Sequence, residues 1–142
     1  MQVFERDDFF ASTTFGGECV SLAACLATLR QLDEAIPEMV RKGNQIQTVF
    51  NQSFGNQAGI KGTSTRLIFT WPTVEHKALF MQEMCKQGIL TGYSNFIMAE
   101  HTQQDIDRIC NAIENTAFTM KIHWANPKAV LQGPLPAEVV RR

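Results

Sequence analysis

Arg66-Leu67-Ile68-Phe69-Thr70-Trp71, which reads RLIFTW, is the stretch that decides the fold class. Its β-branched and aromatic side chains favour an extended strand. The preceding residues 60–64 (IKGTS) are turn-like, and Pro72 closes the strand. Together these features predict a β-hairpin between residues 58 and 71.

Helical patterns flank this hairpin on both sides. Before it, an alanine-rich run over residues 18–29 predicts a deeply buried helix, and Pro37 fits the first turn of a second helix that ends at Gly55. After it, residues 74–87 predict a third helix that Gly88 ends, with an apolar face made of Val74, Ala78, Met81, Met84 and Cys85.

The remaining elements complete an α+β fold. A capping box of Thr102 and Asp105 begins the last helix, and residues 89–90 and 95–98 are two short strand candidates. We therefore expect a small antiparallel or mixed sheet with helices packed on one face. The expected segments are residues 1–17 as an entry segment and hydroxyl-glycine turn, 18–123 as the folded domain, and 124–142 as a C-terminal tail.

Composition excludes several classes of function. The 142 residues carry a net charge of -1, with 44% hydrophobic and 19% charged residues. This balance favours one globular domain and gives no electrostatic reason to bind nucleic acid or an anionic membrane surface. No apolar run approaches a membrane span, and the first residues lack a signal-peptide pattern. We expect a cytoplasmic protein.

The cysteines and histidines do not form a metal-binding pattern. Cys25, Cys85 and Cys110 lie among apolar residues, so we expect reduced, buried thiols and no metal site. We expect His76 to be solvated on a charged part of its helix. His101, beside Glu100 and near Asp105, leaves open an unrelated small enzyme that uses this histidine for acid-base catalysis.

Two polar features are candidates for binding. Residues 12–18, STTFGGE, place three hydroxyls and two glycines before the first helix, which suits a phosphate or other anion, although the same turn also fits a simple N-cap. No lysine follows the glycines, so an ATP-binding P-loop is excluded. Arg66 begins the apolar strand and either holds a carboxylate or is solvated at the strand edge.

Residues 9–18 (FFASTTFGGE) and the helix that follows resemble a segment of class III pyridoxal-phosphate aminotransferases, and glutamate semialdehyde aminomutase most of all. Further similarity follows in the same order at residues 36–38 (IPE), Gly62, residues 79–84 (LFMQEM), residues 88–90 (GIL) and residues 101–107 (HTQQDID). The resemblance extends from about Val3 to Met120.

This resemblance implies the C-terminal small domain of a fold type I enzyme. In the family, the threonine at the place of Thr14 binds the phosphate of pyridoxal phosphate across a dimer interface, with Thr13 and Ser12 as possible assistants. The family's Schiff-base lysine belongs to a large domain that this sequence does not contain. Lys42, Lys61, Lys77 and Lys86 fall on expected polar helix faces or in a turn.

The resemblance therefore implies no catalytic residue here, no covalently bound cofactor, and no transamination by the chain alone. Its expected partners are a second copy of the chain or a chain that supplies the large domain. The alternative is a non-catalytic module derived from that domain, which associates with itself or another protein through apolar residues near the N-terminus. The loop at residues 91–95 (TGYSN) lacks the arginine with which many relatives bind the substrate carboxylate.

Overall fold

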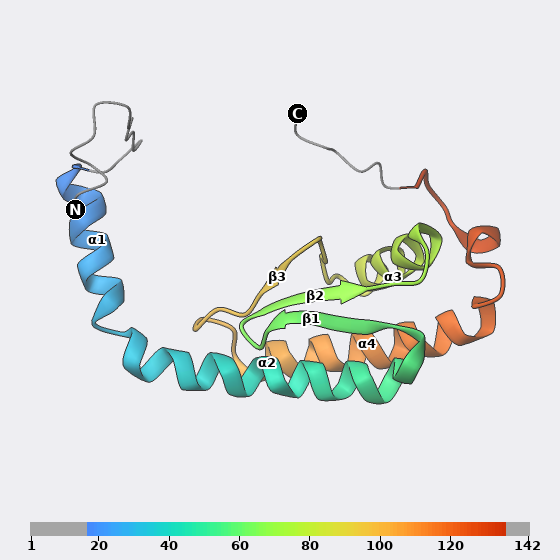
Figure 1. Cartoon of the computed structure of the whole chain (residues 1–142), viewed down its shortest axis with the longest axis horizontal. Helices are drawn as coiled ribbons and strands as arrows, with labels where there is room; N and C mark the ends of the chain where they lie inside the picture. Colours follow the sequence, from blue (N-terminus) through green and yellow to red (C-terminus); the bar gives the residue numbers. More distant parts are fainter. Residues whose placement is uncertain (1–16, 136–142) are drawn as a thin grey trace, which may run out of the picture. The chain divides into compact units, whose positions relative to one another are not determined.

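The computed structural model describes residues 17–135 (Figure 1). Its helices are α1 (Cys19–Leu29), α2 (Leu32–Phe54), α3 (Val74–Lys86) and α4 (Gln103–His123), with short 3-10 turns at Gly55–Gln57 and Pro127–Val130. Its strands are β1 (Gly59–Thr63), β2 (Arg66–Thr70) and β3 (Asn95–Phe96). The described residues fall into two compact units, one ending at Ala35 and the other beginning at Ile36.

The sheet is antiparallel, with strand order β1-β2-β3. The predicted hairpin is confirmed, because Ile60 pairs with Phe69 and Thr63 pairs with Arg66 across the turn. Of the two short strand candidates, residues 95–98 are confirmed in part as β3, and residues 89–90 are not a strand. Residues 89–90 are not extended into the sheet, and Asn95–Phe96 pairs with β2 instead.

One apolar core joins the sheet to α2, α3 and α4. Figure 1 shows α2 and α4 running along one side of the sheet. Aromatic rings fill the centre: the ring centroid of Phe50 lies 4.7 Å from that of Phe69, and Phe69 lies 5.2 Å from Phe80. Ile106 and Ile113 of α4 are fully buried in the same core. The predicted α+β fold is therefore confirmed.

Two helix predictions need correction. The helix α2 begins at Leu32, so Pro37 lies inside it and its ring nitrogen cannot donate to the carbonyl of Asp33. The helix α1 contains no buried residue, although its alanines predicted deep burial. Alanine at high density favours a helix whether or not that helix is buried, and the large apolar side chains of α1 are exposed in the described chain.

The predicted burial of single residues also differs from the structure. On α3, Val74 and Cys85 are exposed, and Leu79 and Phe80 are buried in their place. Cys25 is exposed as well, so only Cys110 of the three thiols expected in the core is buried. Its burial raises the pKa of the Cys110 thiol to about 11, which keeps it protonated and unreactive at neutral pH.

Candidate functional site

The predicted phosphate-binding residues Ser12, Thr13 and Thr14 lie outside the described residues. The described residues begin just after them, at the N-terminus of α1. Glu18 occupies the N-cap position without a side-chain cap to the helix, and its carboxylate accepts a hydrogen bond of 2.7 Å from the hydroxyl of Ser21. Within residues 17–135, no side chain caps the first backbone N–H groups of α1.

Arg66 stands at the start of β2 with its side chain exposed. Its Nε donates to Oγ of Ser94 at 2.7 Å, and its guanidinium lies 5.5 Å from the centre of the Phe96 ring. Its Nη1 and Nη2 atoms make no hydrogen bond to a described residue, so they are available to a planar anion. The Arg66 guanidinium is therefore held through its Nε atom, while its two terminal nitrogens remain free to bind a ligand.

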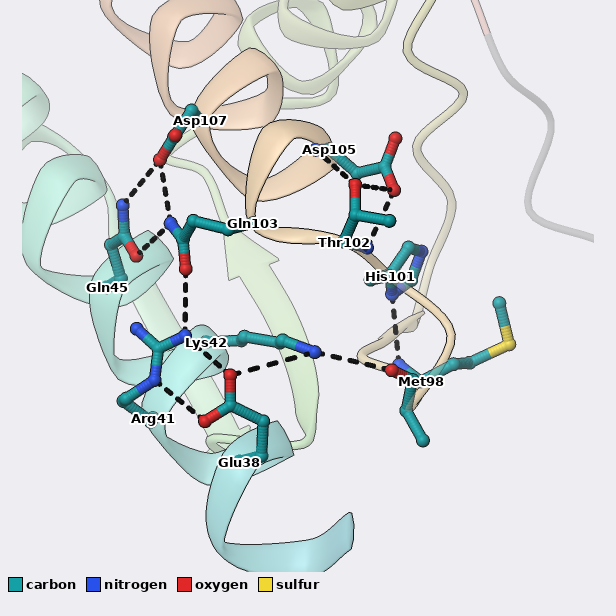
Figure 2. Close-up of polar contacts among 11 residues, drawn as sticks. Glu38, Arg41, Lys42, Gln45, Met98, His101, Thr102, Gln103, Asp105 and Asp107 are labelled. Atoms are coloured by element: carbon teal, nitrogen blue, oxygen red, sulfur yellow. Dashed lines mark hydrogen bonds and ion pairs between the residues drawn. The ribbon is translucent and has the colours of Figure 1, made fainter.

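A polar network joins α2 to the start of α4 (Figure 2). Glu38 accepts hydrogen bonds from Nε and Nη2 of Arg41 at 2.9 and 2.6 Å, and the same Nη2 donates to Gln103 at 2.8 Å. Because of this bidentate pair, the pKa of Glu38 is lowered and the pKa of Arg41 is raised. Gln45 and Gln103 both donate to Asp107. The network satisfies its members internally, which fits a structural role.

The capping box at the start of α4 is confirmed. The backbone N–H and the hydroxyl of Thr102 donate to Oδ2 of Asp105 at 2.8 and 2.7 Å, and Thr102 Oγ1 accepts from the backbone N–H of Asp105. These bonds lower the pKa of the Asp105 carboxyl. His101 makes no hydrogen bond to Asp105 within residues 17–135. Its Nδ1 accepts from the backbone N–H of Met98 at 3.0 Å, so the acid-base pair considered for these residues is not formed.

Two residues expected at the surface are buried. His76 is 8% exposed, and its ring nitrogens bond to Oγ1 of Thr73 and to the carbonyl oxygen of Trp124. Lys42 is 6% exposed, and its Nζ donates to the carbonyl oxygen of Ala99 at 3.3 Å (Figure 2). The interpretation of both as solvated residues is wrong. The hydrogen bond from the Lys42 ammonium to Ala99 holds the loop that precedes α4 against α2.

Two of the described lysines, Lys61 and Lys77, line one cavity. A cavity of about 230 Å³ between the sheet and α3 is lined by Lys61, Lys77 and Tyr93. A Schiff-base site needs a lysine beside the ring and an acidic partner for the pyridine nitrogen. This cavity has no carboxylate in its lining, and Nζ of Lys77 lies 5.7 Å from the centre of the exposed Tyr93 ring.

None of the helices in residues 17–135 has the length and apolar content needed to cross a membrane. Within the same residues, no group of histidine, cysteine and acidic side chains could hold a metal ion.

Among comparisons with known proteins, the comparison of structures gives a match, and the comparisons of sequence do not. No protein-family model matches the chain, and no curated protein gives a significant match. A solved structure does match with a TM-score of 0.68: the pyridoxal-phosphate internal aldimine form of the FumI protein of Sphingopyxis sp. MTA144. The match covers 88% of this chain and 33% of the FumI chain, at 17% sequence identity. The chain therefore has the fold of about one third of a pyridoxal-phosphate protein.

Proposed function

We propose that this chain is the C-terminal small domain of a class III pyridoxal-phosphate aminotransferase or aminomutase. The observation that carries the proposal is the fold shared with part of FumI over 88% of the chain. The sequence resemblance supplies the finer assignment, and it matches the confirmed hairpin and the capped helix α4 in chain order. The reaction would take place in the cytoplasm, on an amine and a keto compound.

Thr14 has the central role in this proposal. Its hydroxyl and the neighbouring backbone N–H groups would bind the cofactor phosphate of the adjacent subunit, with Thr13 and Ser12 assisting. The sequence resemblance supports this role, since Thr14 stands at the place of the family's phosphate-binding threonine. The cofactor itself would supply the electron sink for the reaction when bound.

Arg66 is the proposed contact for a substrate carboxylate. The bond to Ser94 and the ring of Phe96 fix its guanidinium, and two of its nitrogens remain open toward solvent. It lies on the strand that pairs with β3, next to the segment where many relatives carry their carboxylate-binding arginine. A carboxylate would bind this planar group through two parallel hydrogen bonds.

The proposal assigns no catalytic residue to this chain and needs a partner that supplies the large domain. The test is to express the chain together with a separately supplied lysine-bearing large domain of a class III aminotransferase and to titrate the complex with pyridoxal phosphate. Thr14→Ala should weaken cofactor binding about tenfold or more, because one charge-assisted hydrogen bond is lost. Thr14→Ser, which keeps the hydroxyl, should bind nearly as well as the unaltered chain.

Two results would contradict this assignment. One is unchanged cofactor affinity in the Thr14→Ala complex. The other is a single stoichiometric adduct when the 142-residue chain alone is treated with pyridoxal phosphate and borohydride. That adduct would place a Schiff-base lysine in this chain.

A second candidate function is a module that associates with itself or with another chain. The observation that favours it is the apolar surface of α1, where Val20 is 73% exposed, Leu22 and Leu29 are each 56% exposed, and Leu26 is 51% exposed. Exposed apolar groups gathered on one short helix are typical of a protein interface. The apolar residues nearer the N-terminus that the sequence analysis indicated lie outside the described residues.

A further inference from the structure

The face of the sheet opposite the core carries cations and no acids. Ile60 and Leu67 pack into the core, and side chains alternate between the two faces of a strand. Lys61 and its cross-strand partner Ile68 therefore lie on the other face, and so does Arg66, two residues before Ile68. The three strands contain no aspartate or glutamate. This face of the sheet is therefore positively charged.

The cavity of about 230 Å³ between the sheet and α3 collects two of these charges. Lys61 of β1 and Lys77 of α3 both line it, and its lining contains no carboxylate. In residues 17–135, neither lysine has an ion pair or a hydrogen bond through its ammonium. Nζ of Lys77 lies 5.7 Å from the centre of the Tyr93 ring, which lines the same cavity. Its ammonium is therefore held beside the cavity.

Two unpaired ammonium groups at one small cavity favour an anionic ligand. Their charges repel each other, and an anion between them replaces this repulsion with two attractions. Lysine binds phosphate as a point charge, whereas the planar fork of arginine suits a carboxylate. A phosphate monoester carries close to two negative charges at neutral pH. The charges at the cavity therefore match a phosphate monoester better than a single carboxylate.

The rest of the lining is mainly apolar and can accept the body of such a molecule. An apolar cavity of about 150 Å³ already binds benzene, so this cavity can take a phosphate group with a ring beside it. Aromatic and aliphatic walls with a few polar groups are typical of small-molecule sites. The apolar members of the lining are Ile68, Phe69, Trp71, Phe80 and Met81.

We propose that this cavity binds a phosphate monoester with a small apolar body. The phosphate group lies between the ammonium groups of Lys61 and Lys77, and the body packs against Trp71 and Met81. Every residue of the site belongs to the compact unit that begins at Ile36. The site therefore needs neither the large domain nor the proposed cofactor role of Thr14.

Phenyl phosphate, inorganic phosphate and benzoate are suitable probes. Inorganic phosphate lacks the ring, and benzoate has the ring but only one negative charge. Calorimetry and two-dimensional NMR on the 142-residue chain at neutral pH and low salt should show saturable one-to-one binding of phenyl phosphate, tighter than that of the other two probes. The amide shifts should be concentrated in residues 60–71, 77–81 and 91–93. Added salt should weaken the binding, because it screens the charges.

Single lysine substitutions test the two contacts. Lys77→Gln should weaken phenyl phosphate binding about tenfold, because a half-buried, charge-assisted bond is lost. Lys61 is more exposed, so Lys61→Gln should weaken it only about threefold. The control is Lys121→Gln on α4, which makes the same change in net charge away from the cavity. It should leave the affinity unchanged.

Three outcomes would overturn the proposal. The first is no saturable binding of phenyl phosphate to the folded chain. The second is an equal effect of the three lysine substitutions, which would mean that only the overall charge matters. The third is benzoate or inorganic phosphate binding as tightly as phenyl phosphate.

Thr14→Ala separates this site from the proposed cofactor role. It should leave phenyl phosphate binding to the chain alone unchanged. Loss of binding in Thr14→Ala, with Lys77→Gln unaffected, would place the phosphate at the hydroxyl-glycine turn and overturn the proposal. The NMR map of the unaltered chain decides the location even if a variant folds poorly.

Discussion

Asp105 and Thr102 satisfy each other at the first turn of α4, and this pair makes the stability of the fold depend on pH. Thr102 holds the Asp105 carboxylate through its hydroxyl and its backbone N–H. Both bonds favour the ionised form, so the pKa of Asp105 is lower in the folded chain than in the unfolded chain. The folded chain therefore binds fewer protons at this residue than the unfolded chain over the interval between the two values.

The sign of the pH effect follows directly. The contribution of Asp105 is fully present above its unfolded pKa, about 4, and is lost as pH falls through the lower folded value. We predict that Asp105→Asn lowers the free energy of unfolding at pH 6, and that the difference from the unaltered chain shrinks below about pH 4. Guanidinium unfolding followed by circular dichroism at both pH values measures it.

Glu114→Gln is the matched control on the same helix, because its carboxylate makes no hydrogen bond to a described residue. It should show a smaller loss at pH 6 than Asp105→Asn. A difference between Asp105→Asn and the unaltered chain that stays constant from pH 6 to pH 3 would show that the carboxylate is not what the cap depends on.

Residues could be predicted from the sequence where their partners are near in the chain. Thr102 and Asp105 are three positions apart, so spacing alone indicated their bond. His76 bonds to a carbonyl 48 positions away and Lys42 to one 57 positions away, and neither partner is visible in a local pattern. The charged residues next to them in the sequence therefore led to the wrong prediction of solvent exposure for both. The sequence also gave no indication that the Thr91 hydroxyl would be buried without a hydrogen-bond partner among the described residues.

At the scale of elements, α2 and the β1–β2 hairpin approach each other closely at one glycine. A β-carbon built on Gly43 would lie 1.7 Å from the carbonyl oxygen of Ser64, in the hairpin turn. The Ser64 hydroxyl also donates to Oδ1 of Asn44 at 2.5 Å. A side chain at position 43 would push the hairpin away from the helix and disturb the core beneath it.

Gly43→Ala therefore tests this packing by the sign of its effect. In an exposed helix, alanine in place of glycine would stabilise by about 1 kcal/mol. Here we predict the opposite, a loss of about 1 to 3 kcal/mol or more from overpacking against the Ser64 backbone. Urea unfolding followed by tryptophan fluorescence measures the change.

Gly133→Ala is the control for this substitution, because a β-carbon there meets no atom within 4 Å. It should change the free energy of unfolding by only a few tenths of a kcal/mol. A Gly43→Ala chain that is more stable than the unaltered chain would mean that α2 and the hairpin do not touch at this point.

The elements that were predicted correctly are specified by residues close together in the sequence. The errors concern segments whose structure depends on contacts with residues far away in the chain. The hairpin has a turn and a β-rich strand, and α4 has a capping box. Residues 89–90 and 95–98 are both short segments with apolar residues beside the same turn. Only Asn95–Phe96 pairs with the edge of β2. Pairing at that edge, and not strand propensity, decided which segment joined the sheet.

At the scale of the whole molecule, α1 has no buried side chain, unlike the other helices and the sheet. The helices α2, α3 and α4 and the sheet share one core, whereas no residue of α1 is buried. The chain also covers only 33% of the length of FumI. A helix with four large exposed apolar side chains is unfavourable in water, which supports the proposal that another protein surface covers it.

Leu26→Glu tests whether a second copy covers α1. Under the proposal, the unaltered chain sediments above its monomer mass of 16.0 kDa at micromolar concentration, and Leu26→Glu shifts it toward the monomer. A carboxylate at the centre of an apolar interface would lose its water without gaining a partner. Ile122→Glu on α4 is the control, since Ile122 is similarly exposed, at 66%, but lies on another helix. A strictly monomeric, folded chain would leave a partner that supplies the large domain as the remaining candidate to cover α1.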